Sequence, residues 1–100
     1  MKRCLSALLV SAVLATPAWS NPVLAQQKNC MACHTIDRKI VGPAYRDVAK
    51  KYAGQDVAAR LAVKIRQGGK GVWGVIPMPA NPKVSEDEAR QLANWVLSLR

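Results

Sequence analysis

Two cysteines and the only histidine of the chain lie within five consecutive residues, and this cluster constrains the fold more than any other feature. The stretch reads Cys30-Met31-Ala32-Cys33-His34. Two thiols at this spacing can undergo a thiol–disulfide reaction, contribute to a zinc site or hold a covalently attached haem. The rest of the sequence has to decide among these three uses.

Residues 1–20 have the pattern of a cleaved secretory signal peptide. Lys2 and Arg3 give a positive start, and the uncharged apolar run LSALLVSAVLA follows. A proline and small residues then predict cleavage after Ser20, with cleavage after Ala18 as the alternative. The apolar run is shorter than the roughly 20 residues that a spanning helix needs, so an uncleaved anchor is the less favoured interpretation. We therefore expect export to the periplasm, with no membrane span after cleavage.

Cleavage would leave residues 21–100 as one compact domain. Cys4 leaves with the leader, so the mature chain keeps Cys30 and Cys33 as its only cysteines. A domain of this size struggles to stabilise itself by burial alone, and a disulfide across so short a loop would add little. We therefore expect another group to fill the middle of the domain.

The chain is strongly basic. Its formal net charge of +9 falls to +7 when Lys2 and Arg3 are removed with the leader. The basic residues are scattered and form no run typical of a nucleic-acid-binding tail, and export also argues against nucleic acid as a partner. Two interpretations stay open: a solvated surface, or a surface that is steered toward an acidic docking partner.

Apolar residues at spacings of three and four predict four helices, and no convincing strand alternation is present. Residues 69–82 carry apolar side chains but are too rich in glycine and proline to be helical. The fold class is therefore all-α, with alanine-rich helix faces that suit a bulky flat group better than a self-filled core. The predicted helices are residues 22–29, residues 44–52, residues from an N-cap at Asp56 to Gly68-Gly69, and residues from a capping box at Ser85-Glu86-Asp87-Glu88 onward.

The three uses of the cysteine–histidine cluster can now be compared. A structural zinc site needs four ligands, and the mature chain offers only two thiols and one imidazole, all adjacent. A thiol–disulfide oxidoreductase normally carries its C-x-x-C pair in a fold with a sheet, which the sequence does not predict. The full C-x-x-C-H pattern is the attachment signature of c-type haem: Cys30 and Cys33 reach its two vinyl groups, and His34 binds the iron.

A low-spin haem iron needs a second axial ligand, and Met78 is the candidate. His34 is the only histidine, and Met31 lies between the two cysteines, from where it cannot reach the opposite face. Pro77 and Pro79 fix the backbone on either side of Met78 and suggest a side chain aimed at a partner. The alternative is a methionine that only fills a gap in the core. A haem sensor or haem enzyme with an open sixth position also stays open at this point.

Five segments carry a resemblance that covers almost the whole mature chain. The sequence resembles the short bacterial class I monohaem cytochromes c of the five-fifty-one type, with the segments in that family's order and close to its spacing. The resemblance implies about four helices wrapped around one covalently attached haem c. The segments are C-M-A-C-H, V-G-P-A-Y at residues 41–45, G-V-W-G at residues 71–74, I-P-M-P at residues 76–79, and the last helix ending W-V-L-S.

The resemblance also implies a role for each of eight residues. Cys30 and Cys33 correspond to the thioether anchors, and His34 and Met78 to the two iron ligands. Pro43 corresponds to the proline whose carbonyl accepts the other ring N–H of the histidine, although it also suits a helix start.

Three further residues are expected around the haem, each with a plainer alternative. Trp73 corresponds to an indole donor to a haem propionate, or it only packs. Lys64 corresponds to a basic propionate partner, or it is a solvated lysine. Asn81 corresponds to an amide that orients the methionine sulfur, or it is a turn residue.

Two positions depart from the family pattern, and neither is a ligand. Asn29 stands where the family often has glycine, and Ala25 stands where some members carry a large aromatic residue. The first and last helices cross near these positions in the family, so Asn29 leaves the crossing geometry open.

The function that the resemblance implies is electron transport in the periplasm. The expected protein is a soluble, monomeric single-electron carrier with His/Met-ligated haem iron, and it is not an enzyme. Its partners would be redox proteins with acidic surfaces: a quinol-oxidising complex upstream, and a nitrite reductase or terminal oxidase downstream. The alternative functions are the thiol–disulfide oxidoreductase and the haem sensor or enzyme.

Overall fold

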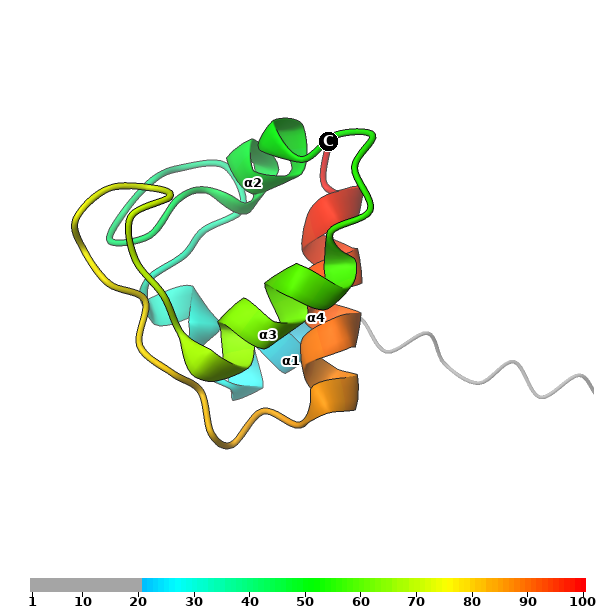
Figure 1. The fold of residues 1–100 in the computed structure, drawn as a ribbon. Helices are drawn as coiled ribbons and strands as arrows, with labels where there is room; N and C mark the ends of the chain where they lie inside the picture. The colour runs from blue at the N-terminus through cyan, green and yellow to red at the C-terminus, as the bar shows by residue number, and fades with distance from the viewer. Residues whose placement is uncertain (1–20) are drawn as a thin grey trace, which may run out of the picture.

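A computed structural model describes residues 21–100, and the predicted signal peptide lies outside the described residues. The described chain is all-α, as predicted, and its only β-type pairing is an isolated bridge between Gly69 and Met78. None of the described helices is both long and apolar enough to cross a membrane. The helices are α1 (Asn21–Gln27), the single 3-10 turn η1 (Cys30–Ala32), α2 (Tyr45–Lys51), α3 (Ala58–Gln67) and α4 (Glu86–Ser98) (Figure 1).

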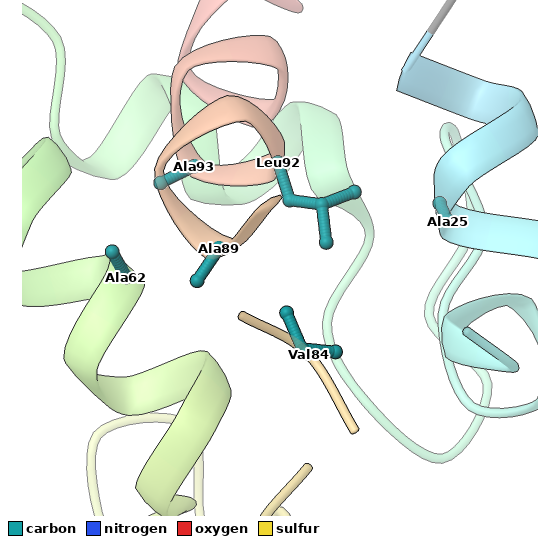
Figure 2. Close-up of a cluster of buried hydrophobic side chains, with 6 residues drawn as sticks. All are labelled: Ala25, Ala62, Val84, Ala89, Leu92 and Ala93. Carbon is teal, nitrogen blue, oxygen red and sulfur yellow. The ribbon is translucent and has the colours of Figure 1, made fainter. Parts of the chain in front are cut away.

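Helix α4 is the element against which the other helices pack. Figure 2 shows Ala25 of α1 and Ala62 of α3 on either side of α4, with Ala89 and Ala93 on α4 itself. Ala25 and Ala89 are completely buried, and small side chains at these positions let the helices approach closely. Ala25, one of the two positions that depart from the family pattern, is therefore a contact of the α1–α4 crossing.

A second buried cluster attaches α2 to the end of α4. The apolar face predicted for α2 is buried as expected, and Val96 of α4 packs into the same cluster. The members of this cluster are Tyr45, Val48, Tyr52, Val57 and Val96.

Asn29 lies two residues after α1 and starts the turn that carries the cysteines. Its φ of 62° and ψ of 19° are in the left-handed region. Glycine adopts this region most easily, and asparagine is among the few other residues that do so without a large cost. Asparagine at this position is therefore compatible with the left-handed turn between α1 and η1.

The start of α3 differs from the sequence prediction. Asp56 was expected as the N-cap, but Val57 occupies that position and no side chain caps the helix. Val57 is buried in the cluster that joins α2 to α4, and this packing moves the helix start beyond the aspartate.

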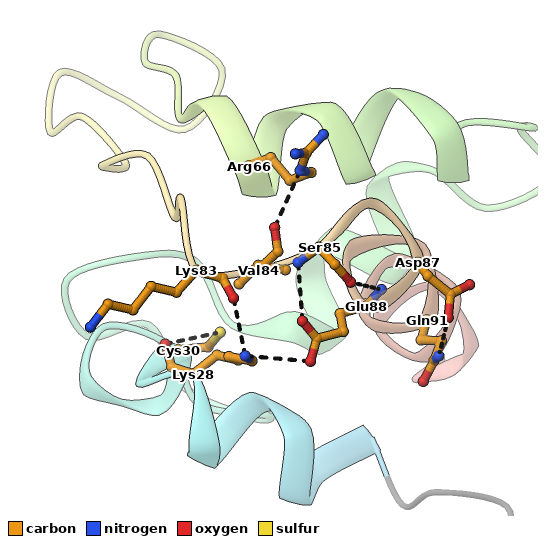
Figure 3. A network of polar contacts seen from close by, with 9 residues as sticks. All are labelled: Lys28, Cys30, Arg66, Lys83, Val84, Ser85, Asp87, Glu88 and Gln91. Atoms are coloured by element: carbon orange, nitrogen blue, oxygen red, sulfur yellow. Dashed lines mark hydrogen bonds and ion pairs between the residues drawn. The ribbon is translucent and has the colours of Figure 1, made fainter.

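The start of α4 is fixed by the predicted capping box and by polar links to two other helices (Figure 3). Ser85 Oγ accepts from Glu88 N at 3.1 Å, and Ser85 N donates to Glu88 Oε1 at 3.0 Å.

Lys28, just after α1, donates from Nζ to Lys83 O at 3.0 Å and lies 3.4 Å from Glu88 Oε2. Arg66 of α3 donates from Nε to Val84 O at 3.2 Å. These links hold α1, α3 and α4 together at one end of the domain.

Glu88 should make the stability of the fold depend on pH. The Ser85 backbone N–H, followed by Lys28, lowers the pKa of Glu88 below its usual value. The carboxylate therefore stabilises the fold fully above the pKa of an unfolded glutamate, about 4.3, and this contribution is lost as the pH falls through the lowered folded-state pKa. Denaturant titrations of wild type and Glu88→Gln should show a difference in unfolding free energy that is largest near neutral pH and shrinks in acid.

Asp87→Asn is the matched control, because Asp87 lies in the same helical turn but outside the capping box. Asp87→Asn should retain the acid-dependent loss of unfolding free energy that Glu88→Gln removes. The role of the Glu88 carboxylate would be contradicted if the difference in unfolding free energy between wild type and Glu88→Gln stayed constant from neutral pH to well below the carboxylate range.

Candidate cofactor site

A cavity of about 630 Å³ lies between the helices and the loops that precede α2 and follow α3. Its size falls within the range of small-molecule and cofactor sites, about 300–1,000 Å³. The two loops, teal and yellow in Figure 1, meet at the same side of the molecule. The cavity is lined by all eight site residues predicted from the sequence: Cys30, Cys33, His34, Pro43, Lys64, Trp73, Met78 and Asn81.

The turn η1 places the two cysteines and the histidine on this one cavity. Cys33 N and His34 N both donate to Cys30 O, at 3.2 Å and 3.0 Å, so the motif is wound into a tight turn. Both thiols are free and half-buried. Burial raises the pKa of the Cys30 thiol, which favours its neutral form.

A hydrogen bond defines the orientation of the His34 ring. His34 Nδ1 lies 2.8 Å from the carbonyl oxygen of Pro43. A carbonyl can only accept, so Nδ1 carries the proton and donates it to this bond. In the neutral ring Nε2 then has a free lone pair, which is the state in which an imidazole binds a metal ion.

Two neighbours confine the same ring, and neither was identified from the sequence as a site residue. Tyr45 stacks on it with ring centroids 4.9 Å apart and planes inclined by 19°. A Cβ atom at Gly42 would lie 2.5 Å from His34 Cε1, so only glycine leaves room for the ring. The sequence analysis placed Tyr45 in the predicted helix of residues 44–52 and gave Gly42 no role of its own, and no local signal indicated that both contact the histidine.

Met78 is held by its backbone against the end of α3. Gly69 N donates to Met78 O at 3.0 Å, and Met78 N donates to Gly69 O at 2.7 Å. Gly68 has a φ of 76°, and a Cβ atom there would collide with Met78 O. Gly68 was expected only to end the helix, but its lack of a side chain also permits this close approach.

The remaining predicted residues line the cavity, while their expected roles stay predictions. The Asn81 side-chain Nδ2 donates to Ile65 O at 2.8 Å and to Pro79 O at 3.4 Å, so this amide ties the chain after Met78 to α3. The stem of Lys64 lies beside Gly69. Trp73 is 37% exposed and forms part of the cavity wall.

The residues that line the cavity fit a covalently attached haem. Two free thiols, one imidazole nitrogen with a lone pair and one thioether face a space lined by apolar side chains from α3 and α4, among them Leu61, Ile65 and Leu92. Sulfur and imidazole ligands suit iron, and apolar walls suit a porphyrin.

Comparisons with known proteins agree with this chemistry. The profile of the family described as Cytochrome c matches residues 22–100. The chain is 57% identical over 97 residues to cytochrome c-551 of Pseudomonas aeruginosa, covering 94% of this chain and 92% of that protein. It is 56% identical over 95 residues to cytochrome c-552 of Hydrogenobacter thermophilus, covering 93% and 96%. The crystal structure of cytochrome c552 from Nitrosomonas europaea superimposes with a TM-score of 0.76 at 52% identity, covering 79% of this chain and 99% of that one.

Gly42 should be intolerant of any side chain. In Gly42→Ala the added methyl group would displace the His34 ring, and overpacking of this kind costs about 1–3 kcal/mol of unfolding free energy. The matched control is Gly69→Ala, because the nearest atom to its added methyl would be the flexible Lys64 Cε at 3.2 Å. Denaturant unfolding of both variants checks the prediction, and equal losses would contradict it.

Proposed function

Because this chain belongs to the cytochrome c family, we propose that it is a periplasmic single-electron carrier whose iron is ligated by His34 and Met78. The family carries a covalently attached haem of the c type. The observation that supports the proposal most strongly is the cavity itself, which is lined by Cys30, Cys33, His34 and the distant Met78.

Four side chains would hold the haem. Cys30 and Cys33 would form thioether bonds to its two vinyl groups, and His34 Nε2 and the Met78 sulfur would bind the iron. Trp73 and Lys64 are the proposed propionate partners, and Asn81 is the proposed support of the methionine sulfur. When bound, the haem supplies a one-electron iron couple, whose potential is higher with Met/His ligation than with two nitrogen ligands.

The polypeptide contributes rigidity to electron transfer. The His34 ring is confined by a hydrogen bond, a stacked aromatic ring and a glycine contact, and the Met78 backbone is paired with Gly69. A site that changes little between two oxidation states needs little reorganisation. If His34 and Met78 both bind the iron, the metal would offer a substrate no open position, which supports a carrier and not an enzyme.

The leader supports the proposed location. Residues 1–20 have the pattern of a secretory signal, and removal after Ser20 would release residues 21–100 as a soluble monomer in the periplasm. Export suits the chemistry because the thiols of a c-type haem site receive the haem outside the cytoplasm.

The charges and apolar side chains near the cavity support acidic redox partners. Lys39, Lys64 and Lys70 line the cavity with a single acidic residue, Asp47. Val75 and Ile76, also in the lining, are 91% and 62% exposed. A basic rim around an apolar centre complements an acidic docking surface. The proposed partners are a quinol-oxidising complex as donor and a nitrite reductase or terminal oxidase as acceptor.

A visible spectrum of protein from a host that matures c-type cytochromes tests the function. The reduced protein should show a sharp c-type band that survives acid–acetone extraction, and its mass should include one haem. The oxidised protein should show the weak red band of a methionine–iron bond, and Met78→Ala should abolish that band.

The same spectrum separates the alternatives. A thiol–disulfide oxidoreductase would show no visible chromophore and a reducible Cys30–Cys33 disulfide. A sensor or enzyme with an open sixth position would bind haem but lack the weak red band. A band that persists in Met78→Ala would refute Met78 as the ligand.

Small redox reagents of opposite charge test the basic rim. Oxidation of the reduced protein by anionic ferricyanide should slow as salt is raised, and oxidation by a cationic cobalt–phenanthroline complex should accelerate. Raising the ionic strength from about 0.01 M to about 0.15 M shortens the screening length from about 30 Å to about 8 Å. Lys70→Gln should weaken both trends, and identical salt trends for the two reagents would argue against a basic docking surface.

A further inference from the structure

Lys51 is the last residue of α2, and its side chain reaches the ring of Trp73 in the loop after α3. Its ammonium nitrogen is 5.6 Å from the centroid of the Trp73 ring and 5.9 Å from that of Tyr52. Both distances fall within the roughly 6 Å over which a cation is attracted to an aromatic face. Trp73 is among the residues that line the cavity, and Lys51 is not.

We propose that Lys51 is a positioning residue that holds residues 70–77 closed over the cavity through its contact with Trp73. It would thereby limit the opening of the loop after α3, which carries Met78 at its end. The proposal rests on the proposed function, because Met78 is taken to be an iron ligand. It adds a residue that neither the cavity lining nor the sequence pattern assigns to the site.

The segment that Lys51 contacts has few other attachments. Val72, Val75 and Ile76 are 49%, 91% and 62% exposed, so burial contributes little to holding it. Within the described chain, the only hydrogen bond found for residues 70–77 is internal to the segment, from Gly71 N to Gly74 O at 3.0 Å. The anchors lie at its base, where Gly69 and Met78 pair. The contact from Lys51 therefore acts on the part of the loop that the base does not restrain.

Lys51 is suited to this contact by its position in α2. Its ammonium takes no part in the ion pairs found among residues 21–100. It also lies in the last turn of α2, where the partial negative charge of the helix end favours a cation. A cation–π contact at a partly exposed site changes an opening equilibrium by about two- to fivefold.

The test compares three variants of the haem-loaded protein. Lys51→Gln removes the charge, Lys51→Arg keeps it, and Lys50→Gln makes the same charge change on the exposed neighbour. Amide hydrogen exchange of residues 70–77 and the rate at which added imidazole abolishes the weak red band report opening of the loop. We expect both rates to rise about two- to fivefold in Lys51→Gln and to stay near wild type in the other two variants.

A double-mutant cycle identifies the partner of Lys51. In a Trp73→Leu background, Lys51→Gln should have no further effect on loop exchange. An effect that persists there would assign the contact to Tyr52 and overturn the proposal, as would equal rates in Lys51→Gln and Lys50→Gln. A wild-type protein without the weak red band would instead contradict the proposed function, and amide exchange would still test the contact.

Discussion

The hydrogen bond from His34 Nδ1 to the Pro43 carbonyl is the interaction on which the site depends. It sets which nitrogen carries the proton, and it links the end of the cysteine turn to the start of α2. Tyr45, two residues after the acceptor, stacks on the ring, and Gly42, one residue before it, leaves space for the ring. One short segment thus supplies the acceptor, the stacking partner and the clearance, so the imidazole has little freedom of its own.

The protein core is small, and this explains why the fold surrounds a cavity. Among large side chains in the described chain, only Val84 is fully buried, and four of the six buried residues in the cluster that joins α4 to α1 and α3 are alanines. Alanine has little apolar area to bury, so these contacts set close helix distances more than they supply stabilisation. Leu61 and Ile65 of α3 are only partly buried and line the cavity, where a flat apolar group would complete their burial.

Local patterns predicted the features that depend on neighbouring residues, and they failed where distant packing decides. The apolar face of α2 and the Ser85–Glu88 capping box follow from spacing along the chain, and the structure contains both. Asp56 looked like an N-cap, but burial of Val57 shifted the helix start. The stacking of Tyr45 and the approach of Gly68 to Met78 depend on how separate segments meet, and no periodicity in one segment encodes that.

The pairing of Gly69 with Met78 divides the loop after α3 into two parts with different freedoms. The paired base fixes where the thioether enters, while the residues between the two ends project outward with Val75 almost fully uncovered. Substitutions within residues 70–77 would change the outer surface of the loop without moving the sulfur of Met78. If Met78 binds the iron and residues 70–77 meet a partner, as proposed, metal ligation and recognition would lie in adjacent but separable stretches of one loop.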